Sequence, residues 1–188
     1  MNEIEEAIEL MRNGKLIVYP TDTLYALGAN IFIKEAVMKI YAIKHRPLNM
    51  PLPICVSSID EIKKYAHVNE MAEKIAKKFL PGKLTIILYK KDIIPDYITK
   101  DKIAIRVPDN EIALKLTKEF PITATSANLH GKKAPNEIKI AKEQLGKNVA
   151  MYIDDGKLYG KPSTIVDLSE GKIKVIREGA IKKEALYV

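Results

Sequence analysis

Tyr19-Pro20-Thr21-Asp22-Thr23-Leu24-Tyr25-Ala26-Leu27-Gly28 joins an apolar run to a turn dense in hydroxyl groups. The apolar run at residues 16–19 predicts a buried strand, which Pro20 ends because proline has no backbone N–H to donate. In open α/β sheets, ligands bind in the crevice outside such strand ends, so the threonines and Asp22 are candidates for contacting a substrate. The alternative is a polar turn whose Asp and Thr side chains bond only to nearby backbone.

Length, composition and charge predict one soluble globular domain. The 188 residues are 47% hydrophobic and 29% charged, which is typical of a chain with a substantial core. The formal net charge of +7 favours anionic partners such as nucleotides or RNA. The single cysteine, Cys55, excludes an internal disulfide and disfavours a thiolate metal site. Because we find no signal-peptide pattern and no long apolar segment, we expect a cytoplasmic protein.

Helix and strand signals alternate along the whole chain. Helices are predicted to begin at the N-caps Asn2, Ser58, Asp109 and Asn136, a further helix spans residues 69–79, and another at residues 36–46 ends before Pro47. Strands are predicted at residues 16–19, 52–56, 84–89, 103–107, 122–125, 149–153, 164–168 and 173–177. The late strands lie too close in sequence for a helical crossover each time. The sequence therefore predicts one α/β domain over residues 1–188, with a twisted, mixed sheet flanked by helices.

Common catalytic motifs are missing from the sequence. It contains no P-loop, no G-x-G-x-x-G fingerprint and no H-E-x-x-H motif, and its three histidines lack metal-ligand spacing. Three polar clusters remain, namely the opening Thr-Asp-Thr loop, Lys44-His45-Arg46-Pro47 and Ser126-Ala127-Asn128. Taken singly, the second cluster is also explained as cations at a helix C-terminus, and the third as a simple turn.

A lysine-rich stretch at residues 61–91 supplies +5 of the net charge. One interpretation is a surface that binds RNA. The other is a solvated helix face, because lysine supplies charge without the interleaved aromatic residues typical of base stacking.

The three polar clusters together resemble motifs of the YrdC family of threonylcarbamoyl-AMP synthases. The opening loop resembles P-T-[DE]-T-x-Y-G-L-G, residues 44–52 resemble K-x-R-P-x-x-x-P-L, and residues 126–128 resemble S-x-N. Further matches lie at residues 81–85, 103–108, 162–167 and 176–181, so the resemblance spans nearly the whole chain. It implies a single-domain YrdC-like α/β fold with an open concave face.

The resemblance also implies a reaction. L-Threonine, bicarbonate or CO2, and ATP are joined into threonylcarbamoyl-AMP with release of pyrophosphate, and a separate transferase uses the product to make threonylcarbamoyladenosine in tRNA. Such a reaction mainly requires anions to be positioned and developing charge to be neutralised, which a site without a Ser-His-Asp triad can do. Mg2+ is expected to accompany ATP, held by phosphates and water rather than by protein side chains.

By the same resemblance, the residues of the site fall into two groups. Lys44 and Arg46 are the expected catalytic pair. The expected ATP-binding residues are Lys44, Arg46, Met50, Lys102, Ser126, Asn128, Ala134 and Arg177. The expected threonine-binding residues are Thr23, Cys55, Arg106, Ala124 and Ser163.

Other functions stay open at this point. A chain of the same fold could bind tRNA or ribosomal RNA through its basic surface without chemistry. A phosphosugar enzyme of related fold, such as dihydroxybutanone-phosphate synthase, would need acidic metal ligands near a basic pocket, and the sequence offers no such cluster beyond Asp22. A carbamoyl-transfer role in hydrogenase maturation would need further domains.

Overall fold

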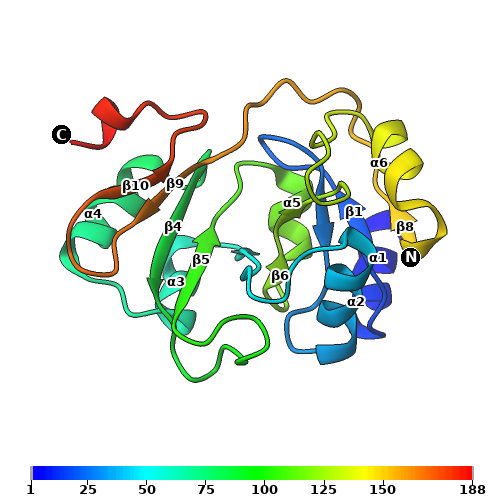
Figure 1. The fold of residues 1–188 in the computed structure, drawn as a ribbon, viewed down its shortest axis with the longest axis horizontal. Helices are drawn as coiled ribbons and strands as arrows, with labels where there is room; N and C mark the ends of the chain where they lie inside the picture. The colour runs from blue at the N-terminus through cyan, green and yellow to red at the C-terminus, as the bar shows by residue number, and fades with distance from the viewer. Residues whose placement is uncertain (1, 188) are drawn as a thin grey trace.

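In the computed structural model, which describes residues 2–187, the strands form two sheets with helices packed around them (Figure 1). The helices are α1 (Glu3–Arg12), α2 (Lys34–Lys44), α3 (Ile59–Tyr65), α4 (Glu70–Phe79), α5 (Glu111–Leu116) and α6 (Ile138–Leu145), with short 3-10 helices η1 (Gly146–Asn148) and η2 (Lys183–Leu186). The strands are β1 (Ile17–Tyr19), β2 (Ala26–Gly28), β3 (Ile54–Cys55), β4 (Leu84–Tyr89), β5 (Lys102–Arg106), β6 (Ile122–Thr123), β7 (Thr125–Ser126), β8 (Met151–Tyr152), β9 (Thr164–Asp167) and β10 (Lys174–Arg177).

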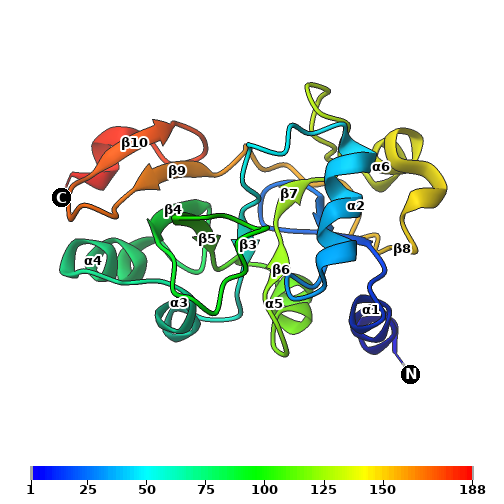
Figure 2. The same ribbon diagram turned by 60° about the horizontal axis from the view of Figure 1, so that its bottom comes forward.

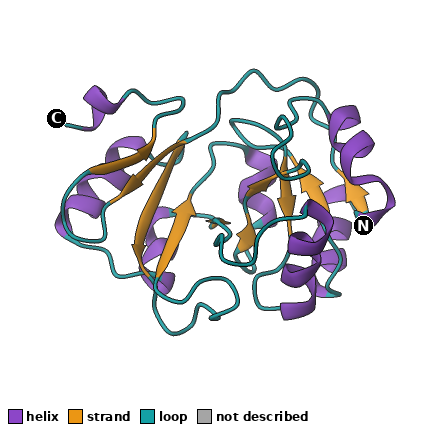
Figure 3. Cartoon of the chain, viewed as in Figure 1, coloured by secondary structure: helices purple, strands orange, loops and turns teal. Residues whose placement is uncertain are grey.

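The two sheets are both mixed and meet near their β6 and β7 strands. One has the order β7-β2-β1-β8 and the other β10-β9-β4-β5-β3-β6. β1 pairs antiparallel with β2 and parallel with β8, while β4 pairs antiparallel with β5 and parallel with β9. Ala124 alone separates β6 from β7, so the chain passes from one sheet to the other at this residue. Elsewhere, loops carry the chain between the two groups of strands (Figure 3).

The helices cover the sheets unequally. α3 and α4 lie on one side of the six-stranded sheet (Figure 2), which leaves its other side facing the loops. β1 is buried on both sides: Val18 packs in the larger core with α2 and α6, while Ile17 and Tyr19 pack in a smaller core with α1 and α5. This double burial explains why the strand that leads into the opening loop is a continuous apolar run.

The helix caps are mostly those predicted. Asn2 and Ser58 each accept a hydrogen bond from a backbone N–H in the first turn of their helix, and Asn69 does the same for α4. Two predicted caps are wrong. Asn110 rather than Asp109 caps α5, accepting from the backbone N–H of Ala113.

The other wrong cap is Asn136. The residue before α6 is Glu137 instead, and its side chain makes no cap hydrogen bond. The loop before α6 is therefore one residue longer than predicted. Helix ends shift by such amounts because several neighbouring polar residues compete for the same position.

Two strand predictions also need correction. A single mixed sheet was expected, but the predicted strand at residues 122–125 is split into β6 and β7, which belong to different sheets. β2 was not predicted, because residues 26–28 follow a polar turn and are too short to show alternation. They pair with β1 along their full length, and a β-carbon on Gly28 would stand 2.9 Å from the Tyr19 ring.

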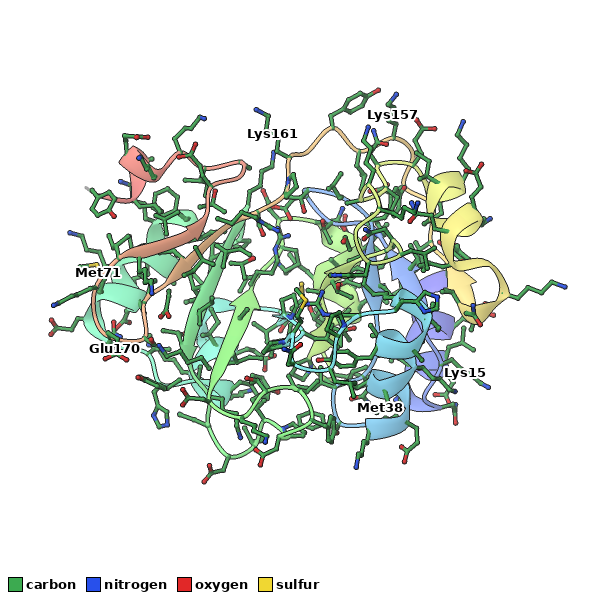
Figure 4. The ribbon with its side chains drawn as sticks, viewed as in Figure 1. Lys15, Met38, Met71, Lys157, Lys161 and Glu170 are labelled. Carbon is green, nitrogen blue, oxygen red and sulfur yellow. The ribbon has the colours of Figure 1, made fainter. Side chains whose placement is uncertain are left out.

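The connection between β8 and β9 runs across the gap between the sheets (Figure 1). Tyr25 fastens it: the Tyr25 hydroxyl donates to the carbonyl of Gly156 at 2.7 Å and accepts from the backbone N–H of Asp155 at 2.9 Å. Lys157 and Lys161 project outward from this connection (Figure 4). No helix within residues 2–187 is both long and apolar enough to cross a membrane.

Candidate active site

A cavity of about 340 Å³ lies where the two sheets meet. The opening loop, β2 and β7 form one wall, and β4, β5, β9 and β10 form the other. Among the residues that line it are three arginines, several hydroxyl side chains and small apolar side chains: Thr21, Thr23, Arg46, Thr85, Ala104, Arg106, Ala124, Ser126, Ala134, Ser163, Ile165, Ile176 and Arg177. None of the lining residues within the described part of the chain is acidic or a histidine.

Arg106, at the end of β5, is anchored to the opening loop. Its Nη2 donates to Asp22 Oδ1 at 2.5 Å and to the carbonyl of Gly82 at 3.1 Å, and its Nη1 donates to Thr23 Oγ1 at 3.1 Å. Both side chains of the Arg106–Asp22 pair are 7% exposed. Within residues 2–187, Asp22 Oδ2 and Arg106 Nε are buried without a hydrogen-bond partner, so the pair meets end-on rather than through a two-pronged contact.

Thr21 shapes the opening loop. Its Oγ1 accepts from the backbone N–H groups of Thr23 and Leu24 at 3.1 and 3.2 Å, and donates to the carbonyl of Leu24 at 2.7 Å. Threonine side chains bond to backbone two or three residues ahead in turns of this kind. The turn brings Thr23 Oγ1 to 2.9 Å from Thr21 Oγ1 and presents Thr23 to the cavity.

The opposite wall carries a second pair of hydroxyl groups and a second arginine. Thr85 Oγ1 and Ser163 Oγ are 2.8 Å apart. Arg177 Nη2 donates to the carbonyl of Ser163 at 2.8 Å. Burial and the nearby charge of Arg106 both lower the pKa of Arg177, which indicates that the two guanidinium groups share one region of the cavity.

Arg46 also lines the cavity and lies just after α2. Its Nε donates to the carbonyl of Met50 at 3.1 Å and its Nη2 to the carbonyl of Pro51 at 2.8 Å, so the side chain is held by its own loop. Partial burial lowers its pKa. The guanidinium faces the cavity, and no carboxylate within residues 2–187 pairs with it, so it can bind an anion.

Lys44 does not line the cavity but lies beneath the Ser126–Asn128 loop. Its side chain is 2% exposed, and Nζ donates to the carbonyls of Ser126 and Asn128 at 2.5 Å each and to Asn128 Oδ1 at 3.3 Å. Burial, followed by the neighbouring charge of Arg46, lowers the pKa of Lys44 to about 7. The three oxygen acceptors match the three N–H donors of the protonated amine. Lys44 therefore fixes the backbone on which Ser126 is presented.

The structure brings eight of the expected site residues to the cavity. They are Thr23, Arg46, Arg106, Ala124, Ser126, Ala134, Ser163 and Arg177. Ala134 also borders a neighbouring cavity of about 430 Å³ beside the β8–β9 connection.

Five other expected site residues are not among the lining residues. Lys44 and Asn128 support the loop around Ser126, and Met50 contributes its carbonyl to Arg46. Lys102 lies further along the sheet, where Nζ is 3.2 Å from Asp167 Oδ2. Cys55 is fully buried in β3, and burial raises the pKa of its thiol to about 11. Their expected ligand contacts stay predictions.

Two features of the site were not proposed from the sequence: Thr85 as a lining residue and the pairing of Asp22 with Arg106, whereas Thr21 was a candidate as part of the opening loop. Thr85 lies within one of the family-like motifs, which was the available signal. The pairing of Asp22 with Arg106 joins residues 84 positions apart, which no local pattern reveals.

Comparisons with known proteins show which sequences and folds the chain resembles. The Sua5/YciO/YrdC family model, described as telomere recombination, matches residues 9–179. A Methanocaldococcus jannaschii protein provisionally named threonylcarbamoyl-AMP synthase is 49% identical over 175 residues, which cover 93% of this chain and 84% of that protein. The Pyrococcus abyssi threonylcarbamoyl-AMP synthase is 38% identical over 190 residues, which cover 98% of this chain and 56% of that protein.

Solved structures show the same fold. P. abyssi Sua5 in complex with L-threonine superposes with a TM-score of 0.93 and 39% identity, covering 97% of this chain and 56% of Sua5. Escherichia coli YciO superposes with a TM-score of 0.88 and 33% identity, covering 95% of this chain and 90% of YciO. The chain thus spans little more than half of Sua5 and most of YciO. The expected YrdC-like α/β fold is confirmed.

Proposed function

The chain belongs to the Sua5/YciO/YrdC family, and from that premise we propose that it is a threonylcarbamoyl-AMP synthase. It joins L-threonine, bicarbonate or CO2, and ATP into threonylcarbamoyl-AMP and releases pyrophosphate. The product serves the formation of threonylcarbamoyladenosine in tRNA through a separate transferase. A cytoplasmic location is part of this proposal.

The observation that carries the proposal is the distribution of charge in one cavity. Arg106, Thr23 and Ser163 line this cavity together with Arg46, Arg177 and Ser126. Arg106 is suited to the carboxylate of an amino acid, because a guanidinium binds carboxylates through directed N–H donors. Arg46 and Ser126 offer a cation and a hydroxyl to phosphate groups. The lining therefore offers groups suited to an amino acid and groups suited to a nucleotide.

The chemistry requires little from the protein beyond this arrangement. The amine of threonine attacks the carbon of CO2 and loses a proton, or attacks bicarbonate with loss of water, and a carbamate forms. A carbamate oxygen then attacks the α-phosphorus of ATP as pyrophosphate leaves. Two negatively charged reactants must approach each other, so Arg46 and Arg177 lower the barrier by neutralising charge on the phosphates. Holding the carbamate next to the α-phosphate lowers the barrier further through proximity.

Mg2+ is expected with ATP, and the side chains of this cavity do not form a cage for it. Within residues 2–187 there is no cluster of three His, Cys, Asp or Glu side chains that could hold a metal ion, and the lining contains no carboxylate. We therefore propose that Mg2+ enters bound to the phosphates and water, as is usual for this ion with nucleotides.

Labelled bicarbonate tests the proposed function. The chain is incubated with 14C-bicarbonate, L-threonine, ATP and Mg2+, and the products are separated by chromatography. A labelled adenylate that requires both threonine and ATP, together with released pyrophosphate, is expected, and Arg46→Ala should abolish most of it. Absence of the adenylate combined with tight tRNA binding would favour the alternative of an RNA-binding module.

The basic stretch at residues 61–91 bears on that alternative. Several of its lysines are paired with carboxylates: Lys63 and Lys77 with Glu73, Lys64 with Glu61, and Lys90 with Asp96. Such pairs reduce the positive potential that RNA phosphates would meet. An RNA contact through this surface stays a prediction, for which filter binding at two salt concentrations is the measurement.

A further inference from the structure

The six-stranded sheet is covered by α3 and α4 on one face (Figure 2) and borders the cavity with the other. In a strand, residues two positions apart point to the same face. Three neighbouring strands therefore contribute to one surface of the cavity. Its side chains are Thr85 and Ile87 of β4, Ala104 and Arg106 of β5, Ser163 just before β9 and Ile165 within it.

Strand pairing divides this surface into two rows. Ile87 of β4 pairs with Ala104 of β5. The same antiparallel register, continued by two residues, places Thr85 opposite Arg106. On the other side of β4, Thr85 pairs with Ile165 and its hydroxyl group contacts Ser163. One row is polar (Arg106, Thr85 and Ser163), and the other is apolar (Ala104, Ile87 and Ile165).

The two hydroxyl groups of the polar row offer a ligand the same combination whichever of them donates to the other. Thr85 Oγ1 and Ser163 Oγ are 2.8 Å apart, and neither has another hydrogen-bond partner within residues 2–187. Together they carry two protons, of which their mutual contact uses one. One proton and lone pairs on both oxygens therefore stay available, so the pair can donate and accept at once.

Burial makes the choice of ligand group matter. Thr85 is 3% exposed and Ser163 is 7% exposed. A ligand that fills the cavity removes water from these hydroxyl groups, and buried hydroxyl groups without partners cost free energy. The ligand group that lies against the pair must therefore replace the hydrogen bonds of that water.

A ligand hydroxyl group matches the combination, because it also donates and accepts. A carboxylate only accepts and an ammonium group only donates, so each would use part of what the pair offers. The carboxylate of an amino acid moreover has Arg106 beside Thr85, on the neighbouring strand. The α-amino group must stay free to attack CO2 or bicarbonate in the proposed reaction. The side chain of the amino acid is the part that remains.

The apolar row suits the rest of such a side chain. Ile87, Ala104 and Ile165 line the cavity next to the hydroxyl pair. A methyl group gains free energy when it is buried against this surface, whereas an amide or charged group would lose its hydration there without compensation. A small side chain with one hydroxyl group and one methyl group satisfies both rows.

We propose that Thr85 is a specificity-determining residue that binds, together with Ser163, the side-chain hydroxyl group of a β-hydroxy amino acid. In L-threonine the methyl group then lies against the apolar row. The inference rests on the proposed function for the identity of the amino acid. The capacity of the pair to donate and accept follows from its contacts.

L-Valine is the probe for this role, because it has the shape of L-threonine without the hydroxyl group. L-Threonine, L-valine and ATP are titrated separately by calorimetry into the full chain and into Thr85→Val. We expect Thr85→Val to lower L-threonine affinity by about 5- to 20-fold, the effect of one lost buried hydrogen bond. The affinities for L-valine and ATP should each change less than about twofold, so the preference for L-threonine over L-valine shrinks.

Three further variants separate specificity from general damage. Thr85→Ser keeps the hydroxyl group and should hold L-threonine affinity within about threefold of wild type. In the Ser163→Ala background, Thr85→Val should cost less than it does alone, because both residues contact the same ligand group. Thr117→Val is the matched control: Thr117 is fully buried outside the cavity lining, and its hydroxyl group donates to the carbonyl of Ala113 at 3.0 Å. It should leave both amino-acid affinities unchanged.

Thermal melting verifies that each variant folds, and Thr85→Ala replaces Thr85→Val if the latter does not. Three results would overturn the inference. They are a wild-type chain that binds L-valine as tightly as L-threonine, a folded Thr85→Val with unchanged L-threonine affinity, and an equal loss of affinity for both amino acids. The last of these is the result that a merely structural role of Thr85 would give.

Failure of the inference and failure of the proposed function are distinguishable. If the chain forms the adenylate but Thr85→Val keeps the wild-type preference for L-threonine, the proposed function survives and the inference fails. If Thr85→Val loses the preference but no adenylate forms, the inference survives and the proposed function fails. A wild-type chain that binds no L-threonine contradicts both.

Discussion

The backbone of Gly160 lies directly against the backbone of Thr23. A β-carbon at position 160 would stand 2.4 Å from Thr23 Cα and 2.5 Å from the Thr23 carbonyl oxygen. The β8–β9 connection therefore supports the opening loop at Thr23, which lines the cavity, and only glycine allows so close an approach.

Gly160→Ala should disturb this support. The added methyl group forces the connection away from Thr23, which we expect to cost about 1–3 kcal/mol of stability and to raise the KM for L-threonine more than the KM for ATP. Steady-state kinetics and urea unfolding measure the two effects. Gly171→Ala is the matched control, since its β-carbon meets open space and only its φ of +70° is unfavourable. Equal effects of the two substitutions would argue against a role for the contact.

Asp22→Asn should weaken both the fold and the amino-acid site. The substitution keeps the shape of the side chain but removes the charge that faces Arg106 in a region where both side chains are 7% exposed. Loss of one partner of a buried ion pair costs about 3–5 kcal/mol, and the end-on geometry places the expected value near 3. Urea unfolding and the KM for L-threonine report the change. Wild-type stability in Asp22→Asn would show that the pair is not needed to hold Arg106.

Lys44→Met should change how stability depends on pH. Burial and Arg46 lower the pKa of Lys44 to about 7 in the folded chain, whereas the ordinary value is 10.5. Between these two values the unfolded state binds more protons, so the contribution of Lys44 to stability increases as the pH rises. Urea unfolding from pH 7 to about pH 9.5 should therefore show the wild type gaining stability relative to Lys44→Met. A difference that stays constant or falls across this range would contradict the lowered pKa.

Arg46→Ala should affect ATP more than L-threonine. Removal of a charged hydrogen-bond donor from a phosphate costs about 1.5–3 kcal/mol, which corresponds to an increase of about 10- to 150-fold in the Kd for ATP. Arg46→Lys should recover only part of this, because lysine is a point charge without the two-pronged geometry. Arg12→Ala is a surface control, since Arg12 binds Glu119 far from the cavity lining. Calorimetric titration gives both affinities.

Cys55→Ala tests whether Cys55 contacts threonine or belongs to the core. The side chain is fully buried with Tyr19 and Ile122 in the smaller core. We expect a loss of about 1 kcal/mol of stability and a KM for L-threonine within about twofold of wild type. The thiol of the native chain should react with Ellman's reagent only after unfolding, because burial raises its pKa to about 11. A large rise in the KM for L-threonine without loss of stability would show that Cys55 contacts L-threonine.

The order of helices and strands was largely predictable, because each carries a local signal. β4 is the continuous apolar run predicted at residues 84–89, and Asn2 caps α1 as its position before the helix indicated. β2 was missed because three residues after a polar turn carry no periodicity. The division into two sheets at Ala124 depends on which distant strands pair with β6 and β7. The few residues of β6 and β7 carry no sequence pattern that identifies those partners.

The candidate site was predictable as a set of residues but not as a set of contacts. Arg46 and Arg106 reached the cavity as the family resemblance implied. The resemblance implies that Lys44 contacts the phosphates, which stays a prediction, but no motif indicated that its ammonium group donates to the backbone carbonyls of Ser126 and Asn128. Sequence motifs identify which side chains recur together, but the direction in which a long flexible side chain points depends on packing from distant elements.

Because arginines line the cavity, an anionic ligand that binds there must displace counter-ions from the solvent. Arg46, Arg106 and Arg177 face a space whose lining has no acidic residue, and Asp22 neutralises only one of them from outside it. Mobile counter-ions from the solvent gather at such a surface, and a nucleotide must displace them as it enters. The affinity of the cavity for ATP therefore depends on the ionic strength of the solution, and it declines as the salt concentration rises.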